Sequence, residues 1–230
     1  MQNEFVFKTI ATVKSDFHSK FGIPRQSGLL KSLQSQIVFE DAYKNPDALR
    51  GLDGFSHLWL LWIFSENQRD SWKPTVRPPR LGGNKRLGVF ATRSSFRPNP
   101  IALSAVKLEK IILDSPKGPY LIVSGADLMN GTPIVDIKPY LPYADSIKKA
   151  NSGFAENVQG YHLDVTCPPE ELEKILPEKR DALLEILSQD PRPAYKEDGE
   201  RVYGFKFADF EISFVVKDGN LSVKKIDPLK

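Results

Sequence analysis

The chain has 230 residues, of which 40% are hydrophobic and 27% are charged, and its formal net charge is +3. This length and composition predict a globular protein with one domain, or one domain and an appendage, around a proper core. Cys167 is the only cysteine and the three histidines have no zinc-ligand spacing, so an intramolecular disulfide is excluded and we expect no metal site. The longest apolar run, residues 58–64, is too short to span a bilayer. We therefore expect a soluble, cytoplasmic protein with no membrane partner.

Short extended segments dominate the first 140 residues. They are rich in β-branched and aromatic residues and are separated by Pro, Gly, Asn and Asp, which predicts β-strands. The predicted strands span residues 4–13, 35–40, 55–64, 86–92, 101–113, 120–126 and 133–140. A short helix is predicted after the second strand, with Asn45 as its cap, Pro46 at its first position and Gly51 at its end. The repeating strand and helix pattern of a Rossmann sheet is absent, so the sequence favours a β-barrel or a β-sandwich.

The pattern changes after residue 142. A polar stretch at 143–160 has the composition of a linker, and helical apolar spacing follows over 169–176 and 177–189. Strands are then predicted within 201–216 and 221–227, around an Asp218–Gly219 turn. We predict a β-barrel domain at 1–148, a linker at 149–163 and a small α+β domain at 164–230. So small a domain rarely folds alone, and we expect it to dock on the first domain.

The basic residues are unevenly distributed along the chain. Between Ser71 and Lys107 there is no Asp or Glu. The cations of this stretch are Lys73, Arg77, Arg80, Lys85, Arg86, Arg93, Arg97 and Lys107. Such a segment suits a polyanion, because each cation near a phosphate releases counterions, and it also attracts carboxylate ligands. It is equally compatible with a solvated loop whose charge is neutralised by acidic residues elsewhere in the fold.

Familiar catalytic motifs are missing from the chain. "LGGNKRLG" (residues 81–88) lacks the endings of a phosphate-binding or dinucleotide-binding loop, and no nucleophile elbow or His-Glu-x-x-His motif occurs. These absences disfavour a hydrolase. Four loops rich in Pro, Arg and Asn remain beside predicted strands: "GIPRQ" (22–26), "SEN" (65–67), "TRSSFRPNPIALS" (92–104) and "GADLMNGTPIVDIKPYLPYAD" (125–145).

In order and spacing, these four segments resemble the TrmO (TsaA-like) family, and the resemblance covers residues 5–145 and extends to the C-terminal appendage. Members are S-adenosylmethionine-dependent enzymes that methylate N6 of threonylcarbamoylated adenosine at position 37, beside the tRNA anticodon. The resemblance implies a mainly β fold, with a small β-barrel that binds the cofactor without a Rossmann sheet or a metal. It also implies a homodimer that acts on tRNA, with the cofactor near the subunit interface.

The resemblance implies a set of cofactor contacts, carried by three of these loops and the opening of the fourth. These residues are Pro24, Arg25, Gln26, Glu66, Asn67, Arg93, Leu103, Asp127, Leu128, Met129 and Asn130. Glu66 departs from the family pattern, which has an uncharged amide at this position. The residue types suit the ligand, because an arginine fork can grip a carboxylate, Asp127 can accept from an ammonium or from ribose hydroxyls, and leucines can supply apolar walls. Each residue also has an ordinary structural role open to it, as an ion pair, a turn or part of the core.

The expected RNA and substrate contacts come mainly from the basic stretch. Arg77, Arg80, Lys85 and Arg86 are predicted to hold phosphates without reading bases, whereas Arg97 or Lys138 could hold the threonyl carboxylate. We interpret Asp136, His18 and His57 as structural, and neither Asp136 nor Tyr143 is assigned as a base. Trp59 and Trp62 are expected in the core and Trp72 at the surface. Two alternatives remain open: a noncatalytic barrel that binds RNA or a ligand, and a methyltransferase of the same fold with another substrate.

Overall fold

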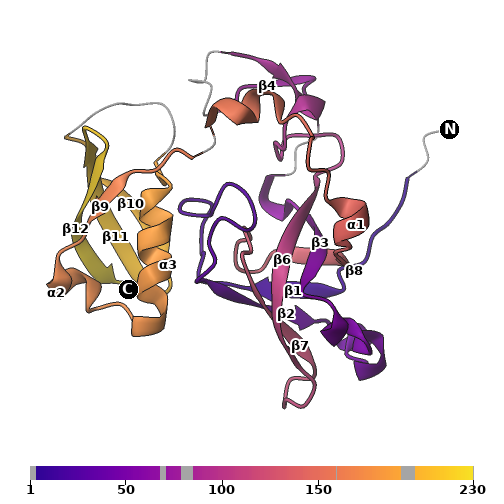
Figure 1. Ribbon diagram of the computed structural model, residues 1–230. Helices are drawn as coiled ribbons and strands as arrows, with labels where there is room; N and C mark the ends of the chain where they lie inside the picture. Colours follow the sequence, from indigo (N-terminus) through magenta and orange to yellow (C-terminus); the bar gives the residue numbers. More distant parts are fainter. Residues whose placement is uncertain (1–3, 68–70, 79–84, 159, 193–199, 230) are drawn as a thin grey trace.

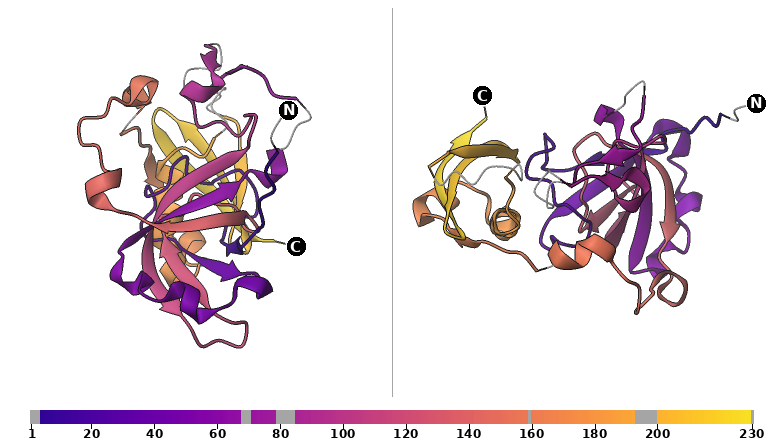
Figure 2. Two further views of the ribbon diagram at one scale, coloured as in Figure 1. Left: turned by 90° about the vertical axis from the view of Figure 1, so that its right-hand side faces the viewer. Right: turned by 90° about the horizontal axis from the view of Figure 1, so that it is seen from above.

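The computed structural model of the protein describes residues 4–67, 71–78, 85–158, 160–192 and 200–229. Two bodies stand side by side, with the N-terminal barrel on the right of Figure 1 and the C-terminal domain on the left. The views in Figure 2 show the same division, with helix α3 lying between the C-terminal sheet and the barrel. The mainly β fold expected from the sequence is therefore confirmed.

Six antiparallel strands among the described residues close into the barrel, in the order β1-β2-β7-β6-β3-β8. The strands are β1 (Ala11–Lys14), β2 (Gln34–Phe39), β3 (His57–Ile63), β6 (Ile101–Ile112), β7 (Tyr120–Ser124) and β8 (Pro133–Pro139). Closure leaves no unpaired strand edge in this sheet, because β1 pairs with both β2 and β8. Alternate side chains fill the interior; on β3 these are Leu58, Leu60 and Trp62, all buried.

The expectation for Trp59 is wrong, because this side chain points to the outer face of β3. It is only half-buried, its indole Nε1 donates to the Asp145 carboxylate at 3.0 Å, and its ring centroid lies 5.4 Å from that of Tyr140. The segment "HLWLLWIF" is apolar on both faces of the strand, so the pattern did not identify the inner face. The predictions for Trp62 in the core and Trp72 at the surface are confirmed.

Short elements connect and cover the barrel. They are the 3-10 helices η1 (Asp41–Tyr43), η2 (Pro46–Leu49), η3 (Leu52–Gly54), η4 (Ser65–Asn67), η6 (Val89–Ala91) and η7 (Gly153–Val158), the helix α1 (Pro142–Asp145) and the hairpin of β4 (Thr75–Val76) and β5 (Leu87–Gly88). The helix predicted at 45–51 is a single 3-10 turn, capped by Asn45 as expected. Gly51, at a φ of 81°, begins the next turn. The predicted strand at 86–92 is strand only at 87–88, and that at 4–13 only at 11–13.

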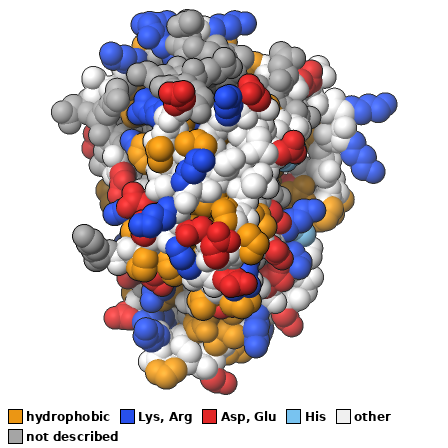
Figure 3. Space-filling view, turned by 90° about the vertical axis from the view of Figure 1, so that its left-hand side faces the viewer, with side chains coloured by type: hydrophobic (Ala, Val, Ile, Leu, Met, Phe, Trp, Pro, Cys, Tyr) orange, Lys and Arg blue, Asp and Glu red, His pale blue; other side chains and the backbone are white. Residues whose placement is uncertain are grey.

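The C-terminal domain is a four-stranded sheet in the order β10-β11-β12-β9. Its elements are β9 (Asp164–Thr166), α2 (Pro169–Leu172), α3 (Pro177–Ser188), β10 (Tyr203–Phe207), β11 (Phe210–Lys217) and β12 (Asn220–Pro228). The predicted Asp218–Gly219 turn joins β11 to β12, with φ of 50° and 78° as a two-residue hairpin turn requires. On the face turned away from the barrel, acidic, basic and hydrophobic side chains are interspersed (Figure 3).

A segment of the N-terminal part of the chain, residues 15–33, completes the C-terminal core. Phe17, Leu30 and Leu33 are buried in the same cluster as Phe207 and the apolar face of α3, and the ring of Phe17 lies 6.1 Å from that of Phe207. Polar contacts reinforce this docking: Lys179 pairs with Asp16 at 2.6 Å, and the Ala208 amide donates to the Asp16 carbonyl. The small domain is therefore docked, as its size predicted.

The helices of the described residues are short, and none of them is both long enough and apolar enough to cross a membrane. Within the same residues, no group of three or more His, Cys, Asp and Glu side chains could hold a metal ion.

Candidate functional site

A cleft of about 2790 Å³ runs between the barrel and the C-terminal domain. The Lys and Arg side chains among its described lining residues are Lys20, Arg25, Lys73, Arg77, Arg86, Arg93, Arg97 and Arg192. Against these cations, the acidic residues of the same lining are Glu4 and Asp190. The cleft therefore presents a positive field, which favours an anionic ligand.

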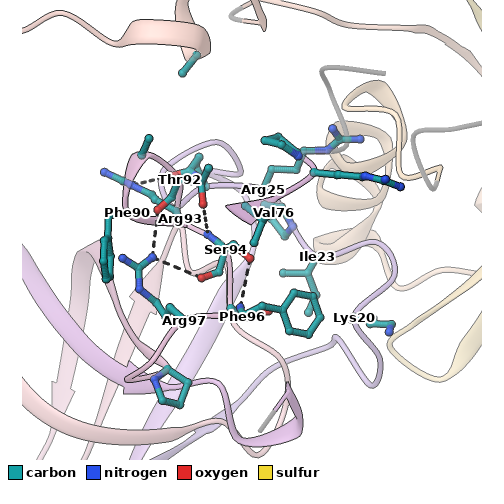
Figure 4. Close-up of a pocket in the computed structure, with 18 of the residues that line it drawn as sticks. Lys20, Ile23, Arg25, Val76, Phe90, Thr92, Arg93, Ser94, Phe96 and Arg97 are labelled. Carbon is teal, nitrogen blue, oxygen red and sulfur yellow. Dashed lines mark hydrogen bonds between the residues drawn. The ribbon is translucent and has the colours of Figure 1, made fainter. Parts of the chain in front are cut away.

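The loop after η6 forms one wall of this cleft and is fixed by its own hydrogen bonds (Figure 4). The Arg97 guanidinium Nη1 donates to the carbonyls of Thr92 and Ser94, at 3.0 and 3.4 Å. The Thr92 hydroxyl in turn donates to the Val89 carbonyl at 2.9 Å and accepts from the Ser94 amide. Pro98 and Pro100 restrict the chain further. Arg93 and Arg97 thus stand on a stiff loop at the cleft surface.

Arg93, Gln26 and Asp127 come from three of the four loops rich in Pro, Arg and Asn. These three residues lie close together. The Arg93 guanidinium donates to the Gln26 amide oxygen, and its charge reaches the Asp127 carboxylate. The loops carrying Gln26 and Asp127 are held close by a hydrogen bond from the Gly28 amide to the Gly125 carbonyl, at 2.8 Å. A side chain at Gly125 would meet the Gly28 backbone at 3.2 Å, so a glycine suits this approach.

Asp127 supplies the carboxylate of this group, and its pKa is raised. Burial raises the pKa of its carboxyl, while the hydrogen bond from the Ser104 hydroxyl and the charge of Arg93 act in the opposite direction. The Ser104 oxygen also accepts from the Trp62 indole at 3.0 Å, so a buried chain from Trp62 through Ser104 orients the carboxylate. Sequence reasoning missed Ser104. Its signal was a polar residue at an inward position of the otherwise apolar strand "IALSAVKL".

Pro24 and Arg25 of the same predicted set connect the barrel to the C-terminal domain. Pro24 is buried, and the Arg25 guanidinium donates to the Asp190 carbonyl at 3.2 Å. Asp190 also pairs with Arg192 at 2.7 Å; burial opposes its ionisation, but the Arg192 hydrogen bonds and charge hold the pKa of its carboxyl below the usual value. Sequence reasoning missed Asp190 and Arg192, since no local pattern places the C-terminal domain against the "GIPRQ" loop.

The residues of "DLMN" after Asp127 face the barrel and the 15–33 segment. Leu128 is 1% exposed and belongs to the barrel core, and its carbonyl accepts from the Ser15 hydroxyl at 2.9 Å. The Asn130 amide oxygen accepts from the Ser15 amide, and the Met129 carbonyl accepts from the Thr132 hydroxyl. The burial of Leu128 and the Asn130 hydrogen bond favour structural roles for these two side chains, whereas Met129 is held here only through its carbonyl. The part of all three in cofactor binding stays a prediction.

Glu66, Asn67 and Leu103 complete the predicted cofactor set. Glu66 is exposed on η4, which also contains Asn67. Leu103 is 49% exposed on the outer face of β6, two residues before Ala105, whose amide donates to the Ser27 hydroxyl. Leu103 therefore lies on the strand that the "GIPRQ" loop approaches, as an apolar contact of this loop region would require.

The predicted RNA and substrate residues divide between two surfaces. Arg77, Arg86 and Arg97 line the cleft, whereas Lys85 is exposed and is not among the described lining residues. Arg80 lies outside the described residues. Lys138 projects from the outside of β8, where it pairs with Asp136 at 2.7 Å, and it does not line the described cleft.

The surroundings of Asp136 and His57 are consistent with the structural roles predicted for them. Tyr143 is considered with them because it is a polar group that is not assigned as a base. The Asp136 carboxylate also accepts from the Ile137 amide at 2.9 Å. Tyr143 is highly exposed on α1, and His57 lies within 2.9 Å of the Ser56 hydroxyl. None of the three is among the described residues that line the cleft.

The same segments match known families. The family model described as the tRNA-methyltransferase O N-terminal domain matches residues 12–146, and that described as the TrmO C-terminal domain matches residues 164–229. The chain belongs to the TrmO family. All three residues of the Arg93, Gln26 and Asp127 group lie within the TrmO N-terminal match.

Two curated TrmO relatives and one solved structure illustrate the extent of the similarity. The chain is 41% identical to the Escherichia coli tRNA (adenine(37)-N6)-methyltransferase, over 98% of this chain and 99% of the relative. A Pseudomonas aeruginosa protein described as a putative S-adenosylmethionine-dependent methyltransferase, RcsF, is 38% identical over 88% of this chain and 89% of its own. The crystal structure of TrmO from P. aeruginosa superposes with a TM-score of 0.79, at 30% identity and 99% coverage of both chains.

Proposed function

We propose that this protein transfers a methyl group from S-adenosylmethionine to N6 of adenosine at position 37 of tRNA. The observation that carries the proposal is the 41% identity to the E. coli tRNA (adenine(37)-N6)-methyltransferase along nearly the whole of both chains. The basic cleft supports it, because its described lining combines many cations with few carboxylates, as binding of a polyanionic RNA requires.

Arg93 and Gln26 at the cleft wall fit the cofactor, together with Asp127, which is not among the described lining residues. S-adenosylmethionine supplies a methyl group that its positive sulfonium makes electrophilic, so the protein's main task is alignment. Arg93 offers a planar guanidinium for a carboxylate, and Gln26 fixes that guanidinium from the opposite loop. Asp127 offers acceptor oxygens to an ammonium or to ribose hydroxyls, and the Trp62–Ser104 chain holds it in one orientation before any ligand arrives.

The substrate is proposed to carry the threonylcarbamoyl group before methylation. In such a nucleoside the N6 atom belongs to a urea-like group with a carboxylate nearby. Arg97 is the better placed of the two predicted carboxylate ligands, because it lines the cleft while Lys138 pairs with Asp136 on the outside of the barrel. Arg97 is braced by the Thr92 and Ser94 carbonyls, so little side-chain entropy would be lost on binding.

Three further statements are proposals of the same kind. The protein acts as a homodimer, it acts in the cytoplasm, and its domains divide at 148/149 and 163/164. Sedimentation velocity tests the first; a single species with the mass of one chain, at the concentrations used in activity assays, would refute it.

The proposed activity is tested by incubating the full chain and S-adenosylmethionine with tRNA that carries or lacks the threonylcarbamoyl group. Nucleoside mass spectrometry of the digested tRNA is expected to show an N6-methylated product from the modified tRNA and none from the other. Equal product from both tRNAs would refute the demand for prior modification. No product from either would refute the methyltransferase.

Arg97→Gln tests the assignment of the carboxylate ligand. The substitution is expected to raise KM for the modified tRNA by about tenfold to a hundredfold, the cost of a lost charge-assisted contact. Lys138→Gln is the matched control and is expected to leave KM unchanged. The reverse outcome would transfer the role to Lys138.

A further inference from the structure

Two large aromatic side chains at the basic cleft are exposed to solvent. Trp72 is 50% exposed and Phe90 is 72% exposed, and both belong to the described lining. Their ring centroids are 6.1 Å apart and their planes are inclined by 33°. Exposed aromatic surface of this kind is unfavourable in water and marks a site where something else is bound.

The backbone holds the two rings next to each other. Strands β4 and β5 pair antiparallel, with Thr75 opposite Gly88 and Val76 opposite Leu87. The Val89 amide extends this ladder by donating to the Pro74 carbonyl at 2.9 Å, and the Val89 side chain is buried. Trp72 and Phe90 follow directly beyond this ladder on the two sides of the hairpin. Their proximity is therefore built into the fold.

The described charges of the hairpin that carries the pair are all positive, although Glu4 also lines the cleft. Lys73 is next to Trp72 in the sequence, and Arg77 and Arg86 lie on the same hairpin and line the same cleft. No Asp or Glu occurs from Ser71 to Lys107, and Asp190 across the cleft is already paired with Arg192. Aromatic faces beside phosphate-binding cations are the composition of a single-stranded nucleic-acid site.

We propose that Trp72 and Phe90 form a stacking platform for an unpaired base of the tRNA anticodon loop. This proposal rests on the proposed function. To bring N6 of the target adenosine to a methyl donor, the enzyme must take that base out of its stack, which leaves the neighbouring bases without a partner on one side. Protein aromatic rings are the usual replacement in RNA loops, and they stack on any base because every base has a π-face.

A second copy of the chain is the less suitable occupant of this patch. On the axis of a twofold dimer the same patch would meet itself, so Lys73, Arg77 and Arg86 of both copies would be brought together. Like charges in contact are costly, whereas RNA phosphates would neutralise the same cations.

The main test uses Trp72→Ala and Phe90→Ala in the full chain, with Leu113→Ala as the control. Leu113 is exposed to a similar degree, at 48%, and is not among the described residues of the cleft. The probe is full-length threonylcarbamoylated tRNA, with S-adenosylhomocysteine present to prevent turnover. Each aromatic variant is expected to bind this tRNA about 5-fold to 100-fold more weakly, the range observed for loss of one stacked base, while Trp72→Phe retains most of the affinity.

Two further readouts separate stacking from a structural role. Tryptophan fluorescence of the unmodified protein should be quenched by the tRNA, and Trp72→Phe should remove that quenching, because Trp62 is buried and Trp59 is half-covered. In tRNA with an abasic site directly before or after the target adenosine, one of the two positions should abolish the difference between the unmodified protein and Trp72→Ala.

Binding of both alanine variants within twofold of the unmodified protein would overturn the platform. A change in sedimentation without a change in tRNA affinity would also overturn it, and would assign the patch to contact between copies. Should an alanine variant fail to fold, Phe90→Leu and the quenching measurement decide the question. If the proposed function is wrong, the unmodified protein forms no N6-methylated nucleoside. If only the platform is wrong, the unmodified protein methylates tRNA and the alanine variants do so with an unchanged KM.

Discussion

The barrel and the C-terminal domain solve the problem of building a core in different ways. The barrel closes on itself, and its cluster of buried residues comes from the six strands and the segments that join them. The cluster of the C-terminal domain includes Phe17, Leu30 and Leu33, which belong by sequence to the other part of the chain. A domain boundary drawn along the sequence therefore does not coincide with the boundary between the cores.

This difference affects the candidate site, because the 15–33 segment contains the "GIPRQ" loop. Its Gln26 contacts Arg93 on the barrel side, and its Arg25 contacts Asp190 on the other side. Gly22, at a φ of 85°, lies so close to the Phe205 ring that an added Cβ would be 2.3 Å from it. The "GIPRQ" loop, which we propose to contact the cofactor, is thus held between the two cores.

The largest loss of stability is expected from Phe207→Ala, which tests whether the two cores unfold separately. Phe207 is fully buried against Phe17, and its truncation should cost about 3–5 kcal/mol of unfolding free energy. If the cores are separate, hydrogen exchange should accelerate in β10 to β12 and α3, while the barrel strands keep their protection. Leu60→Ala, in the barrel core, should give the opposite pattern. Uniform acceleration in both variants would show a single cooperative unit.

Arg93→Ala probes the contact of the "GIPRQ" loop with the barrel side and the proposed cofactor role of Arg93. Loss of a charge-assisted contact should weaken binding of S-adenosylmethionine by about 1.5–3 kcal/mol, measured by titration calorimetry. Arg50→Ala is a suitable control, because Arg50 is exposed and pairs with Asp47 on a distant turn. Unchanged affinity in Arg93→Ala would remove this residue from the site.

Lys179→Ala probes the polar part of the docking between the two cores. The Lys179–Asp16 pair is only partly exposed, and its loss should cost about 1 kcal/mol or less. A double-mutant cycle with Asp16→Asn in urea unfolding measures the coupling. A coupling of zero would mean that this ion pair adds nothing to the apolar contacts and the remaining hydrogen bonds that hold the 15–33 segment in place.

Asp127→Asn should produce the smallest change in stability, and one that depends on pH. Burial raises the pKa of this carboxyl above its value in the unfolded chain, so its stabilising contribution is present below that unfolded value and is lost as pH rises through the folded pKa. Asp127→Asn should therefore gain melting temperature relative to the unmodified protein at pH 7, and lose this advantage below the usual carboxyl pKa of about 3.9. A difference that does not vary with pH would contradict the assignment of the shift to Asp127.

The sequence predicted the barrel well where apolar and polar residues alternate, as in β6, expected at 101–113 and found at 101–112. It failed for Trp59, because a strand that is apolar on both faces carries no information on which face is inside. Gln26, Arg93 and Asp127 were available through the family resemblance, and the structure brings them together. Ser104 and Asp190 were not, because their importance comes from contacts that join distant parts of the chain.

The shared segment also has a consequence for synthesis on the ribosome. Asp16 and Lys179, which pair across the two cores, are separated by 163 positions. The barrel strands leave the exit tunnel first and can close. Phe17, Leu30 and Leu33 stay exposed to solvent until the strands of the C-terminal domain are translated. Transiently exposed apolar side chains of this kind bind holdase chaperones. The nascent chain of this enzyme should therefore be a chaperone client until the C-terminal sheet is translated, even though its barrel is already folded.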